Sequence, residues 1–105
     1  MNKHIRKTRN LDMYRAILTL KTPEELMSFF DDLCTVMELQ AMEQRFQVAM
    51  LLHKGNIYND ILKETGASSA TVSRVNRSLQ YGANGYLTAF ERLEAEDGQG
   101  AGEAL

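Results

Sequence analysis

The sequence of 105 residues predicts an all-α fold of six helices. It contains one proline, few β-branched residues and many leucine, methionine, alanine, glutamate and glutamine residues, which favour helices. Apolar residues recur every three or four positions, and no segment alternates with the period of two that a strand requires. The length is that of one domain, which as a monomer buries only a modest fraction of its surface.

The first two predicted helices have clear N-terminal signals. One helix spans residues 11–20, with Asn10 as its N-cap. The next begins at Thr22, and Pro23 fills the first helical position, where its missing amide hydrogen costs nothing. Glu25, three residues after Thr22, completes the pattern of a capping box. The apolar faces of these two helices consist of Leu11, Tyr14, Ile17, Leu18, Leu26, Phe29, Phe30 and Leu33.

A third helix is predicted from about residue 35 to His53, and Gly55 ends it. Its last two turns are apolar nearly all round, so we expect other helices to surround it. The main apolar stripe consists of Leu39, Met42, Phe46, Ala49 and His53, and it is widened by Val48, Leu51 and Leu52.

Two short helices joined by a tight turn are predicted between residues 57 and 80. Gly66 can adopt the left-handed conformation that ends the first helix, and Ser68 or Ser69 can cap the second. This is the pattern of a helix-turn-helix, whose second helix enters the major groove of DNA. The residues predicted to face the core are Ile57, Ile61 and Leu62 before the turn, and Val72, Val75 and Leu79 after it.

The outer face of the second helix of this motif suits DNA. It carries small residues and arginines, and no acidic residue lies between Ala67 and Glu91. Arginines on such a face can reach phosphates or guanines. The same turn also joins ordinary helical hairpins, so a helical protein–protein adaptor stays open as the alternative function.

A last helix is predicted from about residue 86 to 96, with Leu87, Phe90 and Leu93 facing inward. Residues 97–105 contain three glycines and little apolar surface, so we expect a disordered C-terminal tail. The amphipathic faces of 11–33 and 87–93 exceed what so small a monomer can cover, which predicts a homodimer. The predicted domain organisation is a basic N-terminal tail (1–9), a DNA-binding and dimerisation domain (10–96) and the C-terminal tail.

Charge is segregated along the chain, although its formal net value is only −2. Residues 1–10 carry basic side chains and no acid, and 53–82 carry more basic than acidic side chains, whereas 11–52 and 83–105 are net acidic. A basic face can therefore exist on an acidic protein, as phosphate binding requires. For the N-terminal tail, a solvated end and an arm that touches DNA both remain open.

Several classes of protein are disfavoured. Cys34 is the single cysteine and lies far in sequence from His4 and His53, so neither an intrachain disulfide nor a metal site is expected. No apolar run reaches membrane-spanning length and no signal peptide is recognisable, so we expect a cytoplasmic protein without a membrane partner. No glycine-rich phosphate loop, nucleophile elbow or catalytic grouping is present, so we expect neither an enzyme nor a cofactor.

The run from Cys34 to Tyr86 resembles the Trp repressor superfamily, in particular its small Trp-repressor-like branch. The resemblance rests on YNDI at 58–61 and TGASSATVSRVNR at 65–77. It implies an intertwined homodimer that binds a double-stranded operator as a transcriptional regulator of the repressor type, typical of bacteria.

The family's groove-reading positions correspond to residues at the start of the second helix of the motif, with Asn59 contributing from the first. Small side chains there favour close approach and bridging waters over bidentate base contacts. Together, the resemblance and the outer face predict a DNA site of Asn59, Ser68, Ser69, Ala70, Thr71, Ser73, Arg74 and Arg77.

The resemblance also implies a candidate corepressor pocket, in which Arg45 and Arg74 match the family's two arginines and Thr35 and Ser78 match its threonine and serine. The glycine that follows the pocket arginine in the family is Val75 here, and its isopropyl group would project into the space left for the indole. Forcing a ligand in beside a branched side chain costs about 1 to 3 kcal/mol. We therefore expect no tryptophan binding, and the residues select no other effector. As an alternative, the two arginines pair with Glu38, Glu43 or a helix end.

Overall fold

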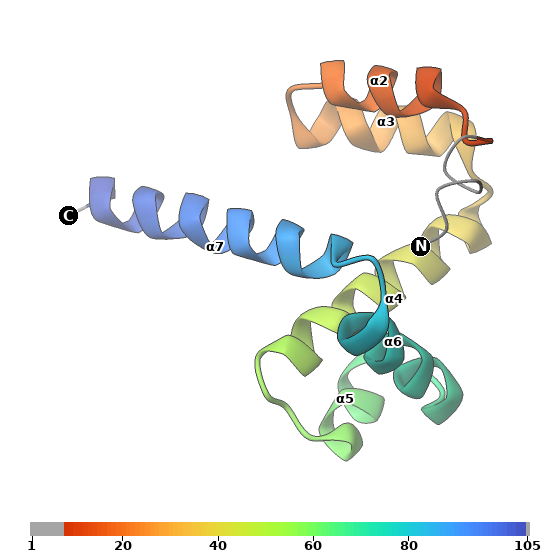
Figure 1. The fold of residues 1–105 in the computed structure, drawn as a ribbon, viewed down its shortest axis with the longest axis vertical. Helices are drawn as coiled ribbons and strands as arrows, with labels where there is room; N and C mark the ends of the chain where they lie inside the picture. The colour runs from red at the N-terminus through yellow and green to blue at the C-terminus, as the bar shows by residue number, and fades with distance from the viewer. Residues whose placement is uncertain (1–7, 105) are drawn as a thin grey trace. The chain divides into compact units, whose positions relative to one another are not determined.

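Six helices make up the part of the chain that the computed structural model describes, residues 8–104, and no strand occurs within it (Figure 1). The all-α prediction is confirmed. By contact density the chain divides into two compact units, unit 1 up to Met42 and unit 2 from Glu43 onward. The helices are α2 (Leu11–Thr19), α3 (Pro23–Leu33), α4 (Val36–His53), α5 (Tyr58–Thr65), α6 (Ser69–Tyr81) and α7 (Gly85–Ala104).

The helices of unit 1 begin where the sequence predicts. The Asn10 side chain accepts hydrogen bonds from the amides of Asp12 and Met13, at 3.1 and 3.3 Å. Thr22 accepts from the amide of Glu25 at 3.1 Å, and Pro23 opens α3. These side chains satisfy amides that have no partner within their own helix.

Glu25 and Glu38, each three residues after a threonine N-cap, accept hydrogen bonds from different backbone amides. Glu25 accepts from the amide of Lys21 at 2.7 Å, one residue before the position that a reciprocal capping box uses. At the start of α4 the box is complete, because Glu38 donates its amide to Thr35 Oγ1 at 3.1 Å and accepts from the Thr35 amide at 2.8 Å. Hydrogen bonds from the backbone and then the side chain of Thr35 lower the pKa of Glu38.

Unit 1 has no buried residue among those that the structure describes. Its helices are amphipathic, yet α2 and α3 by themselves do not enclose a core. The large apolar side chains that remain exposed here are Leu11, Tyr14, Leu18, Met27, Leu33, Val36, Met37 and Met42.

Unit 2 has a true core, to which every helix from α4 to α7 contributes. Val48 and Ala49 of α4 are fully buried, as the apolar last turns of this helix predict. The Phe90 ring of α7 packs against Phe46, His53 and Tyr86, with ring centroids 5.4, 5.1 and 6.0 Å apart. The remaining core residues are Ile61, Ala67, Val72 and Val75, with Met50, Leu51, Leu52, Leu62 and Leu79 packed against them.

One inward-facing prediction is wrong. Ile57 is 64% exposed because it is the N-cap residue of α5, in extended conformation, and its side chain does not share the inner face of that helix. Phe90 of α7 is buried, whereas Leu87 and Leu93 are partly exposed in the single chain, on the face predicted to form the dimer surface.

The end of α7 differs from the prediction. The helix does not stop at Glu96 but continues to Ala104. Glu91, Glu94, Ala95 and Glu96 favour helix, and each later glycine costs only about 1 kcal/mol relative to alanine. Because the residues before Asp97 already form the helix, its extension needs no new nucleus. Leu105 and residues 1–7 lie outside the described residues, so the N-terminal tail stays a prediction.

Candidate nucleic-acid interface

The motif formed by α5 and α6 depends on two local devices at its turn. Gly66 has a φ of +69°, in the left-handed region that a side chain would strain, and its amide donates to the carbonyl of Leu62 at 3.0 Å. Ser68 then caps α6, since its hydroxyl oxygen accepts from the amide of Thr71 at 3.1 Å. Of the two predicted caps, the structure selects Ser68.

A second set of hydrogen bonds, which the sequence did not reveal, braces this turn. The hydroxyl of Thr65 donates to the carbonyl of Ile61 at 2.7 Å and accepts from the amide of Ala67 at 3.1 Å. The carbonyl of Thr65 accepts from Nε2 of Gln44, on α4, at 3.2 Å. Gln44 belongs to no recognisable motif, and the two residues lie 21 positions apart.

The predicted DNA-site residues lie on the outside of this motif. Asn59 is exposed on α5, and Ser68 is exposed immediately before α6. Thr71 is half-buried, and its hydroxyl oxygen accepts from the Ser68 hydroxyl at 3.0 Å, so both side chains serve the turn. The others are exposed along α6: Ser69, Ala70, Ser73, Arg74 and Arg77.

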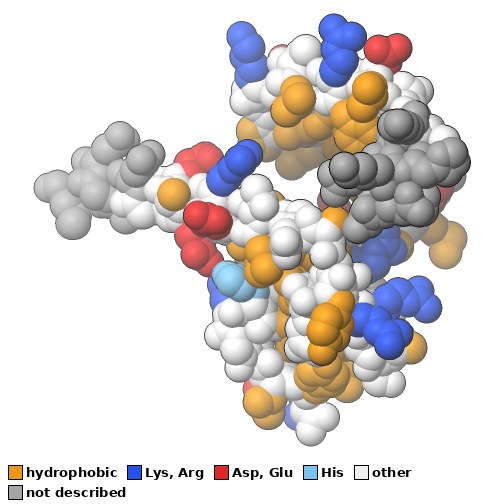
Figure 2. Space-filling view, viewed as in Figure 1, with side chains coloured by type: hydrophobic (Ala, Val, Ile, Leu, Met, Phe, Trp, Pro, Cys, Tyr) orange, Lys and Arg blue, Asp and Glu red, His pale blue; other side chains and the backbone are white. Residues whose placement is uncertain are grey.

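The charge of this face is positive. Figure 2 shows basic side chains over the surface that α6 forms. Among the described side chains, Arg15 lies 3.6 Å from Asp12, and Nε2 of His53 lies 3.1 Å from Glu94. Neither contact involves Arg45, Arg74 or Arg77, so the alternative in which Arg45 and Arg74 pair with Glu38 or Glu43 has no support within these residues.

Three residues of the candidate corepressor pocket lie in different surroundings in the structure. Thr35, in unit 1, is engaged in the capping box with Glu38. Val75 is 2% exposed and belongs to the core of unit 2. Ser78 lies at an open hollow at the end of α6, where it is joined by Arg77, Tyr81 and Gly82.

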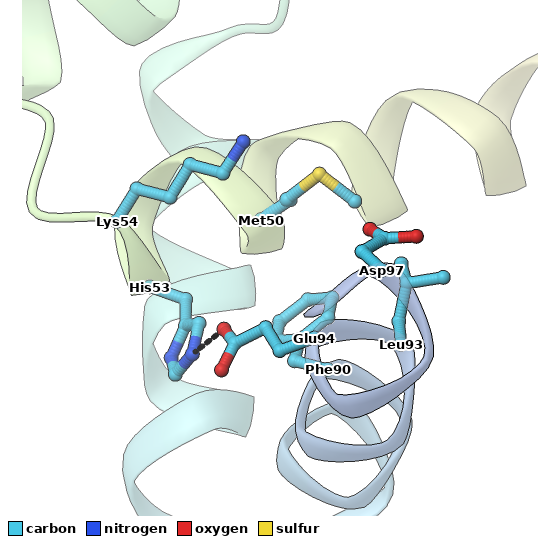
Figure 3. Close-up of a pocket in the computed structure, with 7 residues that line it drawn as sticks. All are labelled: Met50, His53, Lys54, Phe90, Leu93, Glu94 and Asp97. Carbon is cyan, nitrogen blue, oxygen red and sulfur yellow. Dashed lines mark hydrogen bonds and ion pairs between the residues drawn. The ribbon is translucent and has the colours of Figure 1, made fainter. Parts of the chain in front are cut away.

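A pocket of about 110 Å³ lies between the end of α4 and α7 (Figure 3). Phe90, Met50 and Leu93 form its apolar part, and Nε2 of His53 lies 3.1 Å from a carboxylate oxygen of Glu94. This contact ties α7 to the residue that ends α4, just before the chain enters the motif. The remaining lining residues are Lys54 and Asp97.

Two further findings concern the described residues alone. No three His, Cys, Asp or Glu side chains within them group as a metal site would require. None of their helices combines the length and the apolar character needed to cross a membrane.

Comparison with known proteins points in one direction. The family model described as Trp repressor protein matches residues 10–94. The uncharacterised protein YerC of Bacillus subtilis strain 168 is 50% identical over 82 residues, which cover 78% of this chain and 79% of YerC.

Two solved structures have the same fold. One is the crystal structure of a candidate Trp repressor from Staphylococcus aureus, with a TM-score of 0.80 and 47% identity over 86% of this chain and 93% of that one. The other is a TrpR-like protein from Eubacterium eligens, with a TM-score of 0.76 and 51% identity over 79% of this chain and 86% of that one.

Proposed function

This chain belongs to the Trp repressor family, and we propose that it is a sequence-specific DNA-binding transcriptional regulator, acting as a repressor. The family has a regulator fold and is not an enzyme family. The observation that carries the proposal is the exposed face of α6, which presents small residues and two arginines in a helix-turn-helix. As a regulator of bacterial type, it would work in the cytoplasm, where the DNA is.

The N-terminal half of α6 supplies the groove-reading surface. Ser69, Ala70 and Ser73 are short and exposed, so the helix axis can approach the base edges closely. The short hydroxyl side chains of Ser69 and Ser73 would contact bases largely through bridging ordered waters. Arg74 and Arg77 are long enough to reach phosphates or guanines on either side.

The proposed active species is a homodimer bound to an approximately palindromic operator. Helix-turn-helix dimers place their two reading helices about one turn of DNA apart. Support comes from the exposed apolar faces of unit 1, which a second copy of the chain would cover. Because Val75 fills the position of the family's pocket glycine, the dimer is proposed to bind its operator without tryptophan.

Selection of bound fragments from genomic DNA at moderate salt would give the operator, after which Arg77→Ala tests the reading face. The affinity should fall, and the slope of log affinity against log salt should decrease by about one if Arg77 contacts a phosphate. Arg92→Ala is the matched control, because Arg92 is exposed on α7 and belongs to neither helix of the motif. Its affinity and slope should equal those of the parent.

The adaptor alternative makes a different prediction for the same measurement. An adaptor would bind any duplex weakly, with the same affinity for the selected and the scrambled sequence. If the parent binds both duplexes with equal affinity, or if Arg77→Ala binds as the parent does, α6 is not the DNA-reading element.

A further inference from the structure

We infer that Gln44 on α4 is a positioning residue for the DNA-reading end of α6 and thereby contributes to site selectivity. The inference rests on the proposed DNA-binding function. Its starting observation is the hydrogen bond from Nε2 of Gln44 to the carbonyl of Thr65, 3.2 Å long and partly buried. Gln44 itself lies outside the helix-turn-helix and would not touch DNA in the proposed mode.

Thr65 is the residue through which Gln44 can act on the turn. As the last residue of α5, it has a carbonyl without a partner in its own helix, and the Gln44 amide supplies the missing donor. The hydroxyl of Thr65 accepts from the Ala67 amide, on the far side of Gly66. Ser68, the next residue, caps α6. The Gln44 bond therefore holds the turn at Thr65, three residues before Ser68 caps the reading helix.

Few directional contacts hold the motif on the rest of unit 2. Among its described residues, side-chain hydrogen bonds that join two helices occur at Gln44 with Thr65 and at His53 with Glu94. The second joins α4 to α7, so the Gln44 bond is the one that joins α4 to the motif. The burial of Val48, Ala49 and Ile61 also holds the motif, but apolar attraction has no preferred angle, whereas a hydrogen bond has one.

Loss of this bond should affect base reading more than phosphate contact. Base readout requires side chains within about 0.5 Å of the correct position. Arginines that contact phosphates have long, flexible side chains, and a small tilt of α6 leaves such contacts in reach. A hydrogen bond of this kind is worth about a two- to tenfold change in an equilibrium constant. Loosening the turn should therefore lower affinity for the selected site by about that factor.

The test is Gln44→Met, which keeps the length of the side chain and removes the donor. Affinity for the selected site should fall about two- to tenfold, whereas affinity for a scrambled duplex and the salt slope should stay at the parent's values. Gln47→Met is the matched control, because Gln47 is exposed on the same helix with no hydrogen bond described for its side chain. Gln44→Leu is the second variant, and circular dichroism at the assay temperature verifies that each variant is folded.

The outcomes separate the inference from the function on which it rests. If both Gln44 variants keep the parent's ratio of selected to scrambled affinity, the positioning role is wrong while DNA binding stands. If affinity for both duplexes falls together, Gln44 only supports folding, and the inference is again overturned. If the parent itself binds the selected and scrambled duplexes with equal affinity, the proposed function is wrong, and the positioning role is wrong with it.

Discussion

Val75 is a core residue that we propose also alters a ligand site of the family. It stands immediately after Arg74, at the position where the resemblance implies a glycine that leaves room for an indole. The structure buries its side chain, 2% exposed, in the cluster that contains Val48, Ala49 and Phe90. A side chain with this packing contributes to stability by the apolar surface that it removes from water.

Replacement of Val75 by glycine should lower the free energy of unfolding by about 2 to 4 kcal/mol. Removal of a buried side chain of this size leaves a cavity, and glycine inside a helix costs about 1 kcal/mol more. Ser73→Gly is the control, because Ser73 is exposed on the same helix and carries the glycine cost without a cavity. Urea denaturation of both variants separates the two contributions. Equal decreases in the free energy of unfolding would show that the Val75 side chain contributes no packing.

The same position governs the expected response to tryptophan. A ligand shifts a conformational equilibrium only by its differential affinity for the two states, and we propose that Val75 occupies volume that would provide this affinity. Calorimetry with millimolar tryptophan should show no heat, and operator affinity should not change on its addition. Micromolar binding would instead mean that Arg45 and Arg74 act as a ligand clamp.

At the scale of the helices, local signals made the fold predictable. Asn10, Thr22 and Gly66 act where the sequence places them, because a cap is decided by a few adjacent residues. The bond between Gln44 and Thr65 and the contact between His53 and Glu94 join residues 21 and 41 positions apart. No periodicity encodes such pairs, so this part of the candidate site became visible only in three dimensions.

The length of α7 was mispredicted for a related reason. The prediction ended the helix at the glycines after Asp97 because glycine disfavours helix. Extension of a helix also depends on the helical residues that precede them. In α7 those residues include Phe90, which is anchored in the core, and the acidic and alanine residues that follow it.

Replacement of glycine by alanine should therefore have opposite effects at two positions. Gly66→Ala should lower the free energy of unfolding by about 1 to 2 kcal/mol, because a side chain is strained at a φ of +69°. At Gly98, helical and with open space around the site of a Cβ, alanine should raise stability by up to about 1 kcal/mol. Thermal and urea unfolding followed by circular dichroism measure both, and the same sign at both positions would contradict the backbone argument.

At the scale of the whole molecule, the two units differ in how complete they are. Unit 2 has buried residues from four helices, and unit 1 has none among its described residues. Helices as short as α2 and α3 are marginal in water unless an apolar face is covered. A second copy of the chain is the cover that we propose, because two copies also supply the two reading helices that a palindromic operator needs.

Analytical ultracentrifugation at micromolar concentration should therefore find the parent as a dimer. Leu18→Glu places a charge on a side chain that is 84% exposed in the single chain but would be buried between copies. Because obligate dimers often lack a stable folded subunit, this variant should lose helical signal and not yield folded monomers. Ser28→Glu, which adds the same charge at an exposed polar position of α3, should remain dimeric. A parent that sediments as a folded monomer would mean that unit 1 is covered within its own chain.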